Sequence, residues 1–149
     1  MNGEISLKYK VKNINKSFGN LKVLDNISIS FPENKTTCIL GPSGCGKTTL
    51  LNIIAGLLDA DSGELIGFEN KDISFVFQED RLIPWKNVED NLAFVLKKNT
   101  DKREVDKLIN HYLELVGLEK YKHYHPKEVR GGMQQRINIL RAVISESKI

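Results

Sequence analysis

Residues 41–48 read Gly-Pro-Ser-Gly-Cys-Gly-Lys-Thr and match the pattern G-x-x-x-x-G-K-[ST] at every position. Glycine takes backbone angles closed to other residues and leaves room for a ligand to approach closely. Because a helix begins with unpaired amide groups, a glycine turn in front of a helix can hold phosphate oxygens. The pattern therefore predicts a phosphate-binding loop, with Lys47 reaching the β- and γ-phosphates of a bound nucleotide and the Thr48 hydroxyl binding Mg²⁺.

The candidate nucleotide contacts all lie in this turn or directly after it, and the amides from about Gly44 to Thr49 are expected to point at phosphate oxygens. An alternative is a glycine turn that precedes a helix by chance and binds nothing. The candidates are Gly41, Pro42, Ser43, Gly44, Cys45, Gly46, Lys47, Thr48 and Thr49.

Strands and helices must position this turn. The apolar run Cys38–Leu40 is expected to be a buried strand leading in, and the largely apolar stretch Leu50–Leu58 a helix leading out, with a stop signal at 59–63. Ile73–Phe77 is a second short run of buried-strand type that ends at Gln78. Strands that alternate with helices predict an α/β fold with a largely parallel core sheet.

The beginning of the chain has a different pattern. Apolar and polar residues alternate over Ile5–Val11 and again over Ile27–Phe31, with a turn at 18–20 between the two segments and Pro32 after the second. Such alternation is typical of half-buried strands, so the two segments predict an antiparallel β layer. Lysines fill the polar positions of the first segment, which indicates a solvated face and not a nucleic-acid surface.

Two helices are expected in the second half. Residues 101–116 place apolar side chains on one helical face, with Asp101 and Glu104 as a capping box and Gly117 as the stop. A final helix should run from about Gly132. The three histidines, which are His111, His123 and His125, fall in or beside this helical region, where surface or packing roles are expected.

Composition limits the class of protein. With 149 residues, 40% of them hydrophobic, the chain is one soluble domain at most. The net charge of +3 is small and does not indicate a nucleic-acid partner, and none is expected. The N-terminus lacks the apolar core of a signal peptide, and no uncharged run is long enough to span a membrane. Cys38 and Cys45 are expected to be free thiols, because a disulfide would pin the phosphate loop. We therefore expect a cytoplasmic protein.

Three further segments accompany the phosphate loop. They are Phe18 in Lys-Ser-Phe-Gly, the stretch 76–85 reading VFQEDRLIPW, and Tyr124-His125-Pro126 followed by Gly131-Gly132-Met133-Gln-Gln-Arg. In this order they resemble the ATP-binding cassette (ABC) transporter ATPases. The VFQEDRLIPW and GGMQQR stretches look most like the branch that powers nitrate, sulfonate and taurine uptake.

The resemblance implies a P-loop NTPase core, an N-terminal antiparallel β layer and a helical signature region. By position, residues 1–80 would hold the β layer and the core, 81–136 the helical region and 132–149 the signature helix, all as the N-terminal portion of one nucleotide-binding domain. The implied function is the ATP-binding subunit of an importer that couples ATP binding and hydrolysis to solute uptake. Such a subunit lies on the cytoplasmic face of the membrane, with ATP and Mg²⁺ as ligands.

The resemblance also assigns residues, each with a plainer reading beside it. Phe18 would stack on adenine, or be an ordinary hydrophobic turn residue. Gln78 would bind Mg²⁺, or simply end a strand. The stretch Gln78–Trp85 would receive a helix of the membrane-spanning permease, although Trp85 could be a core aromatic. Arg130, Gly131, Gly132 and Met133 would form the signature that meets the nucleotide of a second ATPase subunit in a head-to-tail dimer, or a helix cap without a ligand.

The sequence departs from the family in two places. The signature reads Val129-Arg130-Gly131-Gly132 where the family has Leu-Ser-Gly-Gly. The serine hydroxyl would bond the γ-phosphate, and the bulky fork of arginine does not fit a serine-sized slot. Weaker or asymmetric dimerisation is therefore expected.

The second departure is that the residues run only to Ile149, before the family's Walker B aspartate, catalytic glutamate and switch histidine. No catalytic residue is assigned in this chain, and it is expected to be inactive alone. A truncated or degenerate nucleotide-binding module without hydrolytic activity is the alternative function. A P-loop kinase or GTPase would leave the glutamine and double-glycine segments unexplained.

Overall fold

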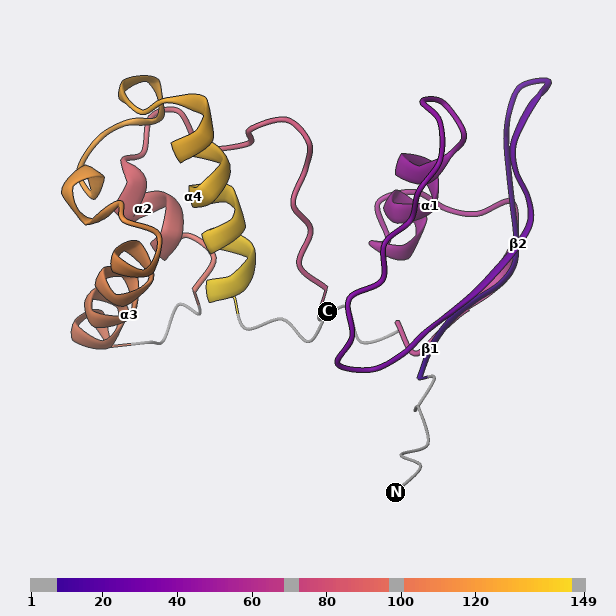
Figure 1. Ribbon diagram of the computed structural model, residues 1–149, viewed down its shortest axis with the longest axis horizontal. Coiled ribbons are helices and arrows are strands. Elements are labelled where there is room, and N and C mark those ends of the chain that lie inside the picture. The colour runs from indigo at the N-terminus through magenta and orange to yellow at the C-terminus, as the bar shows by residue number, and fades with distance from the viewer. Residues whose placement is uncertain (1–7, 69–72, 97–100, 146–149) are drawn as a thin grey trace. The chain divides into compact units, whose positions relative to one another are not determined.

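The computed structural model describes residues 8–68, 73–96 and 101–145 (Figure 1). The chain divides into two compact units, Met1–Ile73 and Ser74–Ile149.

The first unit contains a three-stranded antiparallel sheet with the order β2-β1-β3. Its strands are β1 (Tyr9–Phe18), β2 (Leu21–Phe31) and β3 (Ser62–Ile66), and the helix α1 (Lys47–Ile54) packs beside them (Figure 1). The predicted antiparallel layer and its turn after Phe18 are confirmed. Residues 5–7 of the first expected strand lie outside the described residues. The pairing of β3 with β1 was not predicted, because its sequence reads as a turn.

Irregularities in β1 let both of its buried residues, Val11 and Ile14, face the same core although they are three positions apart. Asn13 and Asn26 take positive φ angles of 52° and 53°, and the Asn13 Nδ2 group donates to Asn26 Oδ1 at 2.6 Å. Gly63 comes so close to this bulge that a Cβ there would meet the Asn13 carbonyl oxygen at 2.5 Å. The core of this unit consists of Val11, Ile14, Leu24, Leu50, Ile53 and Phe68.

The two short strands expected at Cys38–Leu40 and Ile73–Phe77 are not formed in the described residues, where both segments are extended without a ladder. Cys38 is exposed instead of buried, and the Leu40 side chain is 85% exposed, while Ile39 alone packs against the core. A central strand needs a hydrogen-bonded neighbour on each side, and no described segment pairs with either run. The described pairing is therefore antiparallel throughout.

The second unit is helical. Its helices are α2 (Val88–Ala93), α3 (Lys102–Leu115) and α4 (Gly131–Ile144), with the 3₁₀ turns η1 (Glu119–Tyr121) and η2 (Pro126–Glu128) between α3 and α4. The expected helices at 101–116 and from about Gly132 are confirmed, whereas α2 was not predicted. The core consists of Val88, Leu92, Ile109, Leu113, Leu118, Val129, Ile137, Leu140 and Ile144.

The ends of α3 differ slightly from expectation. The Asp101 carboxylate caps the helix by accepting from the Arg103 amide at 3.2 Å, one residue before the amide expected for a capping box with Glu104. Gly117 follows the helix with a φ of 67°, a left-handed angle that glycine adopts without strain. The periodic apolar face therefore located the helix correctly, and only its first hydrogen bond was misassigned.

Candidate functional site

The glycine turn ends where α1 begins, and Gly46 is the capping residue of that helix. Gly44 and Gly46 have φ angles of 80° and 93°, which are strained for any residue with a side chain. No side chain caps the helix, and its first intrahelical bond runs from the Leu50 amide to the Gly46 carbonyl at 2.9 Å. The first amides of α1, at residues 47–49, therefore remain as donors for a ligand.

Gly46 also fixes the turn against the sheet. A Cβ on Gly46 would meet Leu24 Cδ2 at 2.9 Å and the Val23 carbonyl oxygen at 3.0 Å, so the turn touches β2 directly. Behind it, Leu50 and Ile53 of α1 are buried in the core with Leu24. The sheet thus holds the N-terminus of α1, because glycine is the one residue small enough for this approach.

Lys47 lies folded over its own turn. Its ammonium group donates to the Gly41 and Pro42 carbonyl oxygens at 2.8 and 2.7 Å, and Cys45 Sγ lies 3.6 Å away. The turn therefore gathers one ammonium group, free helix amides and the exposed Thr48 hydroxyl at one place. This set of donors is suited to an anion with several oxygens, such as a phosphate chain.

Phe18 stands at the end of the same sheet. Its side chain is 51% exposed, it pairs with Leu21 across the turn, and the Lys16 ammonium lies 5.7 Å from its ring centroid. Leu21 is two residues from Val23, the β2 residue that touches Gly46, which is about 7 Å along a strand. The structure thus places an exposed aromatic ring on the strand pair that supports the turn.

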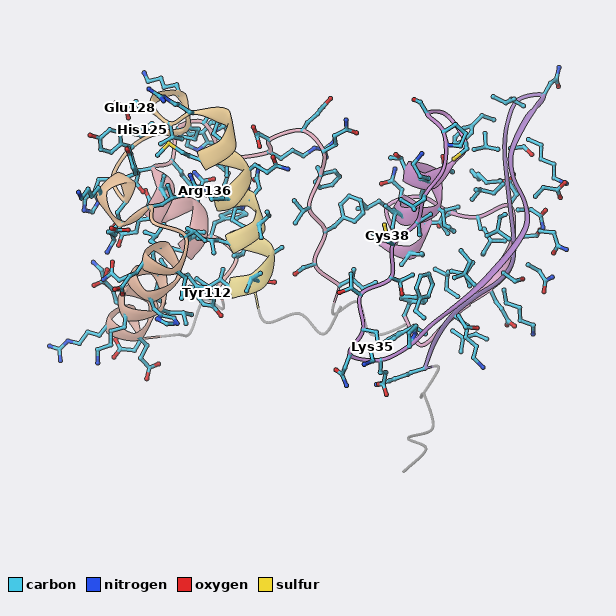
Figure 2. All side chains as sticks on the ribbon, viewed as in Figure 1. Lys35, Cys38, Tyr112, His125, Glu128 and Arg136 are labelled. Carbon is cyan, nitrogen blue, oxygen red and sulfur yellow. The ribbon has the colours of Figure 1, made fainter. Side chains whose placement is uncertain are left out.

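The signature segment begins α4 in the second unit. The Gln134 amide donates to the Pro126 and Val129 carbonyl oxygens at 2.7 and 3.0 Å, and the His125 amide donates to Glu128 Oε2 at 2.6 Å. Figure 2 shows His125 and Glu128 together on the turn that precedes this helix. The Val129 side chain is also buried, so the segment before the glycines is fixed by these hydrogen bonds and by its packing in the core.

Arg136 joins the signature to the neighbouring helix. Its guanidinium donates to the Val116 carbonyl oxygen at 2.7 Å and to the Gly132 carbonyl oxygen at 3.3 Å (labelled in Figure 2). The Val116 carbonyl belongs to the residue that ends α3, where helical carbonyls lack partners. The sequence identified Arg136 only as part of the GGMQQR stretch. The structure shows that its side chain joins the start of α4 to the end of α3.

Within the described residues, neither the backbone angles nor the surrounding space requires glycine at positions 131 and 132. Neither has a positive φ, and a Cβ on either would meet nothing within 4 Å. Arg130 is exposed at the cap, and no side chain caps α4. The surface above these glycines is open to close approach by another molecule.

The stretch Gln78–Trp85 lies along the second unit. The Asn138 amide donates to Asp80 Oδ1 at 2.9 Å, the Arg141 guanidinium donates to the Arg81 carbonyl oxygen at 2.6 Å, and the Arg81 guanidinium lies 3.6 Å from the Phe77 ring centroid. Gln78 is exposed, and Trp85 is 78% exposed, so it is a surface aromatic and not a core residue. Gln78 and Thr48 belong to different units, and a shared Mg²⁺ site stays a prediction.

Other candidate chemistry is limited. The described residues contain no group of three or more His, Cys, Asp or Glu side chains placed to hold a metal ion. Both cysteines are free and exposed. Over the same residues, none of the helices has the length and apolar character needed to cross a bilayer. The ion pair of Lys122 with Asp106 lowers the pKa of that carboxyl, chiefly through a hydrogen bond from Lys122.

Comparison with known proteins decides the family. Residues 24–149 match the family described as ABC transporter. The chain belongs to the ABC transporter family. Among solved ABC structures, it is similar to an ATP-binding cassette in a dimeric, post-hydrolysis state bound to ADP and Pi, with a TM-score of 0.80 and 30% identity over 92% of this chain and 69% of that one. The fold class, a P-loop NTPase core, is therefore confirmed.

Two curated ABC proteins show the extent of the match. The chain is 40% identical to the spermidine/putrescine import ATP-binding protein PotA of Fusobacterium nucleatum, over 91% of this chain and 39% of PotA. It is 39% identical to the sulfate/thiosulfate import ATP-binding protein CysA of Mannheimia succiniciproducens, over 96% of this chain and 44% of CysA. The chain thus spans about two fifths of the length of these relatives.

A second structure supports the fold alone. It is CbiO1 of Clostridium perfringens, described as part of the ABC transporter complex CbiONQ, with a TM-score of 0.80 and 23% identity over 94% of this chain and 62% of that one.

Proposed function

We propose that this chain is the ATP-binding part of an ABC importer subunit. The observation that carries the proposal is the glycine turn at α1, where free helix amides, Lys47 and Thr48 converge and no side chain caps the helix. All of these groups donate hydrogen bonds or carry positive charge, so they fit the phosphates of ATP. The names of the curated relatives, both import ATP-binding proteins, support the importer class.

In the proposed complex, the amides of residues 44–49 hold the phosphate oxygens. Lys47 exchanges its bonds with the Gly41 and Pro42 carbonyl oxygens for bonds to the β- and γ-phosphates. The Thr48 hydroxyl and Gln78 would hold Mg²⁺, and Phe18, exposed on the supporting strands, would stack on adenine. ATP supplies the transferable phosphoryl group, and Mg²⁺ neutralises charge on its oxygens.

The signature is proposed to act on the nucleotide of a second ATPase subunit. The amides that begin α4 are uncapped, and the open surface at Gly131 and Gly132 lets a phosphate approach them. Arg130 replaces a hydroxyl with a cation at the edge of this surface. The charge attracts phosphate, but its bulk separates the two subunits, so a weaker or asymmetric head-to-tail dimer is expected.

The stretch Gln78–Trp85 is proposed to receive the permease, which would place the subunit on the cytoplasmic face of the membrane. Trp85 supports this role because a large exposed aromatic on an ordered turn is typical of binding surfaces. The names of the relatives include polyamine and sulfate importers, so the solute is not assigned, and the nitrate, sulfonate and taurine branch stays a prediction.

Lys47→Ala tests the proposal. Hydrogen bonds to charged groups contribute about 1.5–3 kcal/mol, so the variant should bind a fluorescent ATP analogue about 10- to 100-fold more weakly. Lys35→Ala is the matched control, because Lys35 is an exposed lysine of the same unit outside the turn. Equal affinity of the Lys47→Ala variant and the unaltered chain would refute nucleotide binding at this turn.

A further inference from the structure

Trp85 lies at the tip of a closed turn. Pro84 and Trp85 are its two central residues, and the Lys86 amide donates to the Ile83 carbonyl oxygen at 3.1 Å. Proline is favoured at the first central position because its φ is already fixed at the required value. The turn is therefore locally ordered, although Trp85 itself is 78% exposed.

Asn91 in α2 lies beneath this turn. It is the one fully buried polar side chain among the described residues, with 0% of its surface exposed. Its Oδ1 atom accepts from the Ile83 amide at 2.7 Å. Its Nδ2 group donates to the carbonyl oxygens of Ile83, Lys86 and Asn87 at 3.2, 3.0 and 2.9 Å. One amide group thus holds both ends of the turn that carries Trp85.

The apolar packing of α2 makes a buried asparagine at position 91 unexpected. Val88 and Leu92 on either side of Asn91 are almost fully buried and apolar, so a leucine at position 91 would meet a largely apolar environment. A buried amide is unfavourable unless its hydrogen bonds are made, and here three of the four join the main chain of the turn at Ile83 and Lys86, while the fourth goes to the carbonyl of the next residue, Asn87. Only a side chain that both accepts and donates can make them.

We propose that Asn91 is the positioning residue of the Trp85 surface, holding the turn in one shape so that the partner meets an ordered aromatic. The inference rests on the proposed permease contact for its function, although the positioning role can be tested without the permease. Order present before binding strengthens association, because less conformational freedom is lost in the complex.

The first measurement is amide hydrogen exchange in the whole chain. Asn91→Ala should lower the protection factor of the Ile83 amide by at least about tenfold, since its acceptor is gone. Amides of the α3 core, such as those of Ile109 and Leu113, should keep their protection. Trp85 is the chain's only tryptophan, so its fluorescence anisotropy reports on this turn alone, and it should fall in the variant.

Asn87→Ala is the matched control. The Asn87 side chain accepts from the Asp90 amide at 2.7 Å and caps α2, so the variant removes a bond of equal length from the same region. It should leave the Ile83 amide protected. Unchanged Ile83 protection and Trp85 anisotropy in Asn91→Ala, or equal losses in the α3 core, would overturn the positioning role.

A second variant covers the case in which Asn91→Ala does not fold. Asn91→Asp can accept from Ile83 but can donate to a carbonyl only when protonated. The Ile83 amide keeps its acceptor and should stay protected, whereas Trp85 anisotropy should rise as the pH falls from 7 to about 4 and donation to the carbonyl oxygens returns. A flat anisotropy profile would count against the proposal. Trp85→Ala separates the two ideas: if its binding to permease-bearing membranes is unchanged while Asn91→Ala loosens the turn, the partner assignment fails and the positioning role stands.

Discussion

Glycines in the nucleotide turn differ in what a side chain would meet. Gly44 and Gly46 both have left-handed angles, but only Gly46 touches β2. Gly44→Ala should therefore lower the free energy of unfolding by about 1–2 kcal/mol from backbone strain alone. Gly46→Ala should cost about 1–3 kcal/mol more, because the new Cβ overlaps Leu24. Urea unfolding of the two variants measures the difference, and equal losses would contradict this contact.

Arg130 stands where the resemblance to the family implies a serine. If its bulk weakens the proposed dimer, Arg130→Ser should increase ATP-dependent dimerisation, measured by analytical ultracentrifugation, by roughly tenfold in association constant. Lys127→Ser is the control, because Lys127 is also exposed, lies just before the signature and loses the same charge. A dimer that strengthens equally in both variants would indicate a general charge effect and not a role for Arg130.

Individual functional residues could be predicted from the sequence where they belong to a motif. The glycine turn and its lysine were predictable because their spacing alone specifies the geometry. Asn91 was not, since an isolated asparagine among polar neighbours reads as a loop residue and gives no sign of burial. Trp85 was left open between core and surface, and only the fold shows that it is exposed.

At the scale of elements, Asp61 ties the end of β1 to the segment before β3. Its carboxylate accepts from Lys16 Nζ and from the Ser17 amide, both at 2.7 Å. The hydrogen bond from Lys16, followed by that from the Ser17 amide, lowers the pKa of Asp61. A lowered pKa means that this contribution to stability is present above the ordinary aspartate value of about 3.9 and is lost as the pH falls through the folded value.

The prediction concerns Asp61→Asn. The variant should be less stable than the unaltered chain near pH 7, and the difference in urea midpoint should shrink toward zero between about pH 5 and pH 2. Asp25→Asn is the control, since that carboxylate is 70% exposed and its ion pair within the described part of the chain is with nearby Lys22. A difference for Asp61→Asn that stays constant with pH would show that the ion pair contributes nothing.

The elements that sequence predicted well are those whose pattern is local. Helix α3 follows from its own apolar face, and β1 with β2 from alternation around a turn. The segments 38–40 and 73–77 were expected to be strands because they are apolar, but pairing depends on a neighbour that no short sequence pattern reveals. The strand β3 was missed because its residues have the composition of a turn. They form a strand through pairing with β1, which the local sequence does not reveal.

At the scale of the whole molecule, the chain is proposed to hold nucleotide without completing hydrolysis. The motif matches assign nucleotide contacts to residues of this chain but assign it no water-activating carboxylate. We therefore expect the isolated chain to bind ATP but to release phosphate no faster than the Lys47→Ala variant does. A coupled phosphate-release assay measures this, and turnover that disappears in Lys47→Ala would show that hydrolysis needs nothing further.

The extended segment before the glycine turn has a consequence for handling the protein. Proteases bind their substrates as extended, accessible backbone, and the residues from Lys35 to Leu40 lie outside the sheet with most of their side chains in solvent. A single nick there would separate the β1–β2 hairpin from the loop it supports. Trypsin after Lys35 and chymotrypsin after Leu40 are thus two enzymes against which a preparation of this chain needs protection.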